Sequence, residues 1–269
     1  MKNGRDPVVA PAGGDFDVFV DAWRRSEPEM AFAEVFCPRP QRPRFAIWGA
    51  LASQWRQAAF ELSDARPTQI KCAWWAEEAD CAARAAPRHP LTIALAMPAL
   101  PWADLAHAML VIADTDAARP VDGDAALASV APLADAIATM ESALFGVPVG
   151  AGASRSVAVN LLGSRLRLGL EGAEGGRLPL SLLARHGLTS ADLDAVKGEP
   201  ARRDWARALA TAGFDASRPD ASGAACFYRR ARSAFDQALL QGYANGRRRL
   251  PPLRALFLAW RAARRGGAG

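Results

Sequence analysis

Only a few acidic side chains are placed where they could hold a metal ion. Glu61 and Asp64 stand three residues apart near the end of an expected helix, so both carboxylates can point to one face. Carboxylate oxygens are the ligands that magnesium prefers, and Arg56, on the same helix, could contact an anion beside such an ion. Two carboxylates on one side still make an incomplete site. The simpler interpretation is a solvated helix end, with Arg56 paired to a neighbour such as Glu61.

The other residues with chemical potential form no recognisable site. Asp114, Asp116, Asp122 and Asp124 have alternate spacing, but no glutamate follows to close a calcium loop, and they fit turns and helix caps better. The four cysteines lack C-x-x-C spacing and do not pair with the three histidines, so neither a zinc site nor a disulfide framework is indicated. No histidine stands with a spaced serine or cysteine nucleophile. We therefore expect no metal site.

The elements that position these residues are predicted to be helices. Apolar residues recur three or four positions apart, and no segment alternates as a strand does. The expected helices cover 17–36, 42–63, 67–88, 101–113, 123–145, 154–171, 201–213, 222–245 and 251–265. The chain has 269 residues, of which 51% are apolar, and no long low-complexity linker. It is expected to form one all-α domain over residues 1–269, with flexible ends at 1–14 and 266–269.

Several segments resemble the squalene and phytoene synthase family, and they occur in the family's order. They are Arg44 to Arg56, KCAWWAEE at 71–78 with RHPLTIAL at 88–95, Asn160-Leu161-Leu162, GRLPLSLLARHG at 176–187, and the pair of closing helices at 231–254. The resemblance implies an isoprenoid synthase fold, a single helical bundle with a central cavity. It also implies that helices 42–63 and 154–171 face each other across a cleft.

In that family these two helices carry aspartate motifs, whose carboxylates hold the magnesium ions that bind a prenyl diphosphate. The acidic positions of the first motif, counted from Arg56, are Ala59, Phe60 and Ser63. Counted from Asn160, the arginine and two aspartates of the second motif are Gly163, Ser164 and Leu168. With Gly176-Arg177 as the anchor, they are Arg167, Leu168 and Gly172. Neither alignment supplies a carboxylate. Glu171 and Glu174 are the only acids between 151 and 180, and we expect them at a solvated helix end.

Loss of the motif carboxylates leaves a departing diphosphate poorly stabilised. The resemblance therefore favours a protein that has lost prenyl diphosphate synthase activity and acts as a lipid-binding or protein-interaction module, such as an assembly factor. Its partners would be a hydrophobic isoprenoid or lipid, or another protein, and it would need no cofactor. Trp48, Trp55 and Asn160 could line the cavity, although tryptophans at helical spacing more often belong to a core.

The alternative is an active prenyltransferase of isoprenoid biosynthesis with unusual diphosphate-binding residues. Residual contacts to an anion or metal would then come from Arg56, Glu61, Asp64 and Arg167. Only in this alternative is Mg²⁺ a cofactor.

The net charge of +5 comes from the C-terminal end of the chain. Residues 247–269 contain arginines at 247, 248, 249, 254, 261, 264 and 265 and no acid. In helix 251–265, Arg254, Arg261 and Arg265 share one face, whereas Leu253, Leu256, Phe257 and Trp260 gather elsewhere. The simpler interpretation is that the apolar face packs on the domain and the arginines are solvated. The alternative is contact with anionic lipid.

Two further expectations concern partners and location. A short arginine-rich tail without interleaved aromatic residues or a binding motif gives no reason to expect nucleic acid. The N-terminus lacks an apolar signal region, and the most apolar stretch is interrupted by proline and polar residues. We expect a cytoplasmic protein, peripheral on the inner face of the membrane if the last helix contacts lipid.

Overall fold

The computed structural model describes residues 15–62, 65–97, 99–114, 118–150, 152–172, 176–194, 196–216 and 225–264. These residues form thirteen α-helices and three short 3-10 helices and include no strand, which confirms the all-α class. The α-helices are α1 (Asp17–Ser26), α2 (Pro28–Phe36), α3 (Arg42–Phe60), α4 (Ala65–Ala83), α5 (Pro90–Leu95), α6 (Trp102–Asp114), α7 (Gly123–Ser129), α8 (Ala131–Phe145), α9 (Ala153–Leu168), α10 (Leu180–Arg185), α11 (Glu199–Ala216), α12 (Phe227–Ala244) and α13 (Pro252–Arg264). The 3-10 helices are η1 (Arg39–Gln41), η2 (Ser190–Asp194) and η3 (Val196–Gly198). The expected flexible ends lie outside the described residues, and the single-domain assignment stays a prediction.

Proline divides two of the expected helices. The helix expected at 17–36 is broken at Glu27, before Pro28, and the one expected at 123–145 is broken at Val130, before Pro132. Proline lacks the N–H group that a helix interior needs and is tolerated in the first turn, which is where both prolines lie. The first break matters for the site, because it leaves Glu27 between two helices with its side chain in the interior. The short helices α5 and α10 were not expected.

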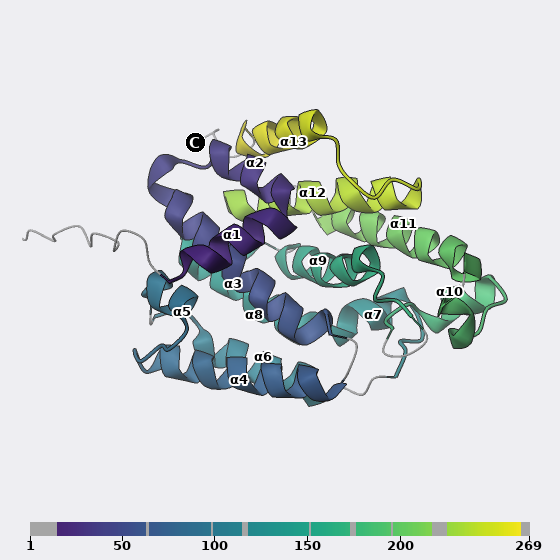
Figure 1. The fold of residues 1–269 in the computed structure, drawn as a ribbon, viewed down its shortest axis with the longest axis horizontal. Helices are drawn as coiled ribbons and strands as arrows, with labels where there is room; N and C mark the ends of the chain where they lie inside the picture. Colours follow the sequence, from purple (N-terminus) through teal and green to yellow (C-terminus); the bar gives the residue numbers. More distant parts are fainter. Residues whose placement is uncertain are drawn as a thin grey trace, which may run out of the picture.

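Helices α3 and α9 lie in the middle of the molecule, as Figure 1 shows, with α4 and α6 along one side and α12 and α13 along the other. Arg165 of α9 donates a hydrogen bond to the carbonyl oxygen of Phe60 at the end of α3. The prediction that these two helices face each other is therefore confirmed. Polar side chains from both helices meet in this region, and the expected cavity stays a prediction.

The apolar interior is one continuous cluster of buried residues. Tryptophans at its centre join α3, α4 and α6. The Trp55 ring makes edge-on contacts with Trp48, Trp75 and Trp102 at centroid distances of 5.5, 6.2 and 6.4 Å. Trp48 and Trp55 are both fully buried, in agreement with the core interpretation of these residues.

Glu78 explains why the KCAWWAEE and RHPLTIAL segments occur together. Its carboxylate is fully buried and accepts hydrogen bonds from the backbone N–H groups of Arg88 and His89. His89 then accepts a hydrogen bond from the N–H of Leu91 through Nδ1, which caps the first turn of α5. The two segments are therefore joined by hydrogen bonds between α4 and the turn that leads into α5.

We expect Gly49→Ala to lower the free energy of unfolding by about 1–3 kcal/mol, although alanine is the better helix former. A Cβ atom at Gly49 would lie 2.3 Å from Cζ2 of the buried Trp23 ring, which has no space to move away. The matched control is Gly163→Ala, whose Cβ would lie 3.3 Å from the end of the flexible Leu240 side chain. Urea denaturation of both variants checks this, and an equal loss in both would contradict it.

Candidate functional site

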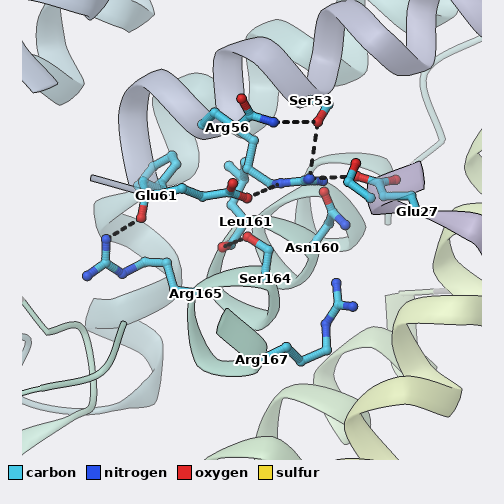
Figure 2. A network of polar contacts seen from close by, with 12 residues as sticks. Glu27, Ser53, Arg56, Glu61, Asn160, Leu161, Ser164, Arg165 and Arg167 are labelled. Carbon is cyan, nitrogen blue, oxygen red and sulfur yellow. Dashed lines mark hydrogen bonds and ion pairs between the residues drawn. The ribbon is translucent and has the colours of Figure 1, made fainter. Parts of the chain in front are cut away.

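Arg56 lies at the centre of a buried polar cluster beside α3 and α9. Its guanidinium donates to Glu27 at 2.5 Å and to Glu61 at 2.7 Å, with a longer hydrogen bond of 3.4 Å to Ser53 (Figure 2). The Arg56 side chain is only 10% exposed. The expected Arg56–Glu61 pair is confirmed, but Glu61 is no solvated helix end, since only 14% of its side chain is exposed. Asp64 lies outside the described residues.

Arg232 of α12 extends this cluster to four elements of the fold. Its side chain is 2% exposed and donates to Glu27 at 2.6 Å, Glu29 at 3.1 Å and Asp236 at 2.8 Å. Asp236 also accepts a hydrogen bond from Asn160 of α9 at 2.9 Å. Buried charges are tolerated only when they are paired and hydrogen-bonded. We call Glu27, Glu29, Arg56, Glu61, Asn160, Arg232 and Asp236 the central ion-pair network.

The network perturbs the pKa values of its members in opposite directions. Burial by itself raises the pKa of Glu27, but the adjacent Arg56 and Arg232 outweigh burial and hold this pKa at about 2. Burial opposes the charge on Arg56 as well, yet Glu27 and Glu61 raise its pKa above the ordinary value. Glu27 is therefore ionised at neutral pH and forms ion pairs with Arg56 and Arg232.

The second-motif positions on α9 differ in where they lie. Gly163 packs against Leu240, and the Ser164 hydroxyl donates to the carbonyl oxygen of Leu161 in its own helix. Leu168 is 58% exposed at the end of the helix. Asn160 points into the central network, as Figure 2 shows. None of these residues supplies a carboxylate.

Arg167 is the least satisfied charge in the region. Its closest carboxylate contact is a 3.9 Å ion pair with Asp236, and its Nε has no hydrogen-bond partner among the described residues. Burial lowers the pKa of Arg167; Asp236 opposes this effect and Arg232 adds to it. Figure 2 shows the guanidinium directed toward Asn160 and Arg56. The side chain of Arg167 is 23% exposed. Arg167 is thus the residue best placed to accept an additional anion.

The first-motif positions are buried and apolar. Ala59 is 6% exposed and Phe60 is 1% exposed, with the Arg177 guanidinium 5.8 Å from the Phe60 ring centroid. Ser63 lies outside the described residues. The described end of α3 therefore presents aromatic and aliphatic surface where the resemblance would place magnesium ligands.

The expectation of a solvated end was wrong for Glu171. This residue is 1% exposed and pairs with Arg165, while its second oxygen accepts the N–H groups of Arg177 and Leu178. The chain folds back after α9 and brings these donors around the carboxylate. Glu171 thus holds the start of the segment GRLPLSLLARHG (176–187) by hydrogen bonds. Glu174 lies outside the described residues.

A second buried ion pair was missed from the sequence. Glu141 of α8 accepts two hydrogen bonds from Arg229 of α12 and a third from the Trp48 indole at 3.0 Å. Glu27, Glu29, Arg232 and Asp236 were missed as well. The available signals were weak: two acids flanking Pro28 inside an expected helix, and a basic and an acidic residue four apart at 232 and 236.

The expectation that the apolar face of the last helix packs on the domain was wrong. α13 packs against α2 and α12, and its buried residues are Ala255, Ala259 and Ala262. Four of its large apolar residues, Leu253, Leu256, Phe257 and Trp260, are 40–83% exposed, whereas Leu258 packs against the core. Arg254 and Arg261 are also exposed, and Arg265 lies outside the described residues. Alanine lets α13 approach its neighbours closely, which turns the bulkier side chains outward.

The described residues contain neither a cluster suited to a metal ion nor a single helix suited to span a membrane. In the described part of the chain, no three His, Cys, Asp or Glu side chains gather in a way that could hold a metal ion. Nor does any described helix alone have the length and apolar composition of a membrane span; α7 and α8 reach them only together, across a bend of 58°.

Comparison with solved structures identifies the architecture. A dehydrosqualene synthase crystallised with a ligand superposes with a TM-score of 0.71 over 95% of this chain and 97% of that one, at 12% identity. This chain has the squalene synthase fold. Squalene synthase HpnC from Alicyclobacillus acidocaldarius matches with a TM-score of 0.53 over 94% of both chains, at 16% identity. No protein-family model and no curated protein matches the sequence.

The match confirms the fold expected from the resemblance. Within this fold, buried ion pairs join Arg56 of α3 and Arg232 of α12 to the carboxylates of Glu27 and Asp236. The arrangement can hold the helices in register and leaves Arg167 with spare hydrogen-bonding capacity.

Proposed function

We propose that this protein is a non-catalytic member of the squalene synthase fold, which has lost prenyl diphosphate chemistry and acts as a lipid-binding or protein-interaction module. The observation that carries the proposal is the state of the central carboxylates. Glu27, Glu61 and Asp236 are each committed to an arginine at 2.5–2.8 Å. None of them is free to hold a divalent cation.

Recruiting these carboxylates for magnesium would require breaking buried ion pairs. Removing one partner of such a pair costs about 3–5 kcal/mol, because the other charge stays buried and uncompensated. A magnesium ion also keeps strict octahedral geometry and is bound through oxygen atoms. Ala59, Phe60 and Leu168, at aspartate positions of the motifs, offer no side-chain oxygen. The protein would therefore stabilise a departing diphosphate poorly.

The retained helical architecture supports a binding role. The chain keeps the squalene synthase fold, and its described core is apolar and rich in tryptophan. A hydrophobic isoprenoid or lipid is the ligand class that such an interior would accept. The proposal also includes a protein partner in place of a lipid. Such a partner would bind an outer surface of the protein.

One observation favours the alternative of an active prenyltransferase. Arg167 has an Nε without a hydrogen-bond partner in the described chain and points toward Arg56 and Asn160. Arginine suits bidentate contacts to phosphate oxygens. In this alternative, Arg167 and Arg56 would replace part of the charge that magnesium supplies, with Glu61 as a residual metal ligand.

We expect no pyrophosphate release from farnesyl or geranylgeranyl diphosphate in the presence of magnesium, above the level without protein. The reason is that the motif positions cannot coordinate the metal that neutralises the leaving group. A coupled phosphate assay over hours measures this. Sustained turnover that disappears in Glu61→Ala or Arg167→Ala would overturn the proposal and establish the alternative.

A further inference from the structure

Helix α13 has its small and large residues on the opposite sides from those of an ordinary surface helix. Ala255, Ala259 and Ala262 are 0–4% exposed against α2 and α12. Leu253 is 83% exposed and Phe257 is 53% exposed. At about 100° per residue, the four large apolar side chains fall within about 100° of the helix surface and form a continuous stripe. Contiguous apolar surface, unlike single exposed residues, marks a contact site.

The chain segment that forms this stripe carries charge of one sign. Arg254, Arg261 and Arg264 of α13 are exposed, and so are the arginines at 247–249 in the segment that leads into the helix. Residues 237–264 contain no acid. The stripe and its arginines together are called the α13 face.

The aromatic residues of this face are ordered against each other. Phe257 and Trp260 have ring centroids 5.8 Å apart, and the Arg264 guanidinium lies 5.3 Å from the Trp260 ring. Tryptophan and arginine at an apolar surface suit the boundary between lipid tails and headgroups, where the ring enters the apolar layer and the charge stays in the polar layer.

We propose that the α13 face docks the protein on an anionic lipid membrane. A helix with arginines on its polar side and Trp, Phe and Leu on the other has the character of an interfacial helix. Figure 1 shows α13 as the outermost helix on its side of the molecule, beyond α2 and α12. The exposure of Leu253 and Phe257 leaves the stripe accessible to a flat membrane. This surface is separate from the central network, so the proposal is independent of whether catalysis remains.

A protein partner is the less favoured occupant of this surface. Protein interfaces usually combine a few arginines with acids and neutral polar groups in a mixed rim. Here three exposed arginines and four exposed large apolar residues lie on one helix, and residues 237–264 contain no acid. Charge of a single sign matches the headgroups of anionic lipids, and it should attract them over about 10 Å at moderate salt.

The test is co-sedimentation of the full chain with vesicles of phosphatidylcholine alone or mixed with phosphatidylserine. We expect binding only to the mixed vesicles, and weaker binding as salt is raised. Each arginine near an anionic surface strengthens binding about fivefold at most, so Arg254→Glu/Arg261→Glu/Arg264→Glu should weaken binding by roughly tenfold or more. Phe257→Ser/Trp260→Ser, which keeps every charge, should also weaken it.

The matched control is Arg66→Glu/Arg84→Glu/Arg185→Glu, which makes the same change of charge at exposed positions on α4, just after α4 and on α10. This control should bind the mixed vesicles much more tightly than the α13 charge variant. Circular dichroism confirms that each variant is folded. Absence of binding to the mixed vesicles, equal binding to both vesicle types, equal loss in the control, or full binding by Phe257→Ser/Trp260→Ser would each overturn the proposal.

Discussion

We expect Arg232→Met to lower the free energy of unfolding by roughly 3–5 kcal/mol, which is a large part of the stability of an ordinary domain. Methionine fills much of the volume of arginine, so loss of packing is small. The cost comes from charge, because Glu27, Glu29 and Asp236 lose the guanidinium that now lies 2.6–3.1 Å from each of them. Urea denaturation followed by circular dichroism measures the change.

Arg24→Met is the matched control for this effect. Arg24 makes an equally short ion pair, 2.6 Å to Glu34, but 39% of its side chain is exposed. Exposed ion pairs contribute about 1 kcal/mol or less, since water screens the charge that remains. Similar losses in the two variants would show that burial of the central network does not control its energy.

The second large effect is a loss of stability in acid. Glu27 has a pKa of about 2 in the folded protein and about 4.5 in the unfolded chain. A depressed pKa means that the unfolded chain takes up the proton first, so the stabilisation is complete above about pH 5 and disappears as the pH falls toward 2. At 1.36 kcal/mol per unit, this contribution is about 3 kcal/mol. Urea midpoints measured between pH 7 and pH 2.5 should fall accordingly.

Glu27→Gln separates this carboxylate from all others. The variant should be less stable than the wild type at pH 7, because Arg56 and Arg232 each lose an ionised partner. It should then lose less stability than the wild type on acidification, so that the two curves converge near pH 2. Parallel curves, with the same difference at every pH, would show that Glu27 does not titrate as its contacts predict.

The helices and their order could be predicted from the sequence because their signals are local. Apolar spacing predicts most of the helices. The segments that contain Glu78 and Arg88-His89 were recognised by their resemblance to the family, and the structure shows that they are joined by hydrogen bonds. Pro28 and Pro132 are also local signals, because each lies in the first turn of a new helix. The loss of the motif acids at Ala59, Phe60 and Leu168 could be read directly.

The partners of the buried charges could not be predicted in this way. Arg232 and Glu27 are 205 positions apart, and Glu141 and Arg229 are 88 apart, so no spacing rule connects them. The same holds for α13, where helical periodicity gives the apolar stripe but not the direction in which it points. That direction depends on how closely alanine lets the helix approach α2 and α12.

The sequence by itself determined the helical class, the resemblance of fold and the absence of carboxylates at the recognised motif positions. These are properties of single residues and of neighbours along the chain. Only the tertiary structure decided that the carboxylates of the central ion-pair network are paired with arginines. It also decided that α13 turns four large apolar side chains outward. Charge pairing and burial depend on the distance between atoms in space, and distant segments acquire that distance only when the whole chain packs around one core.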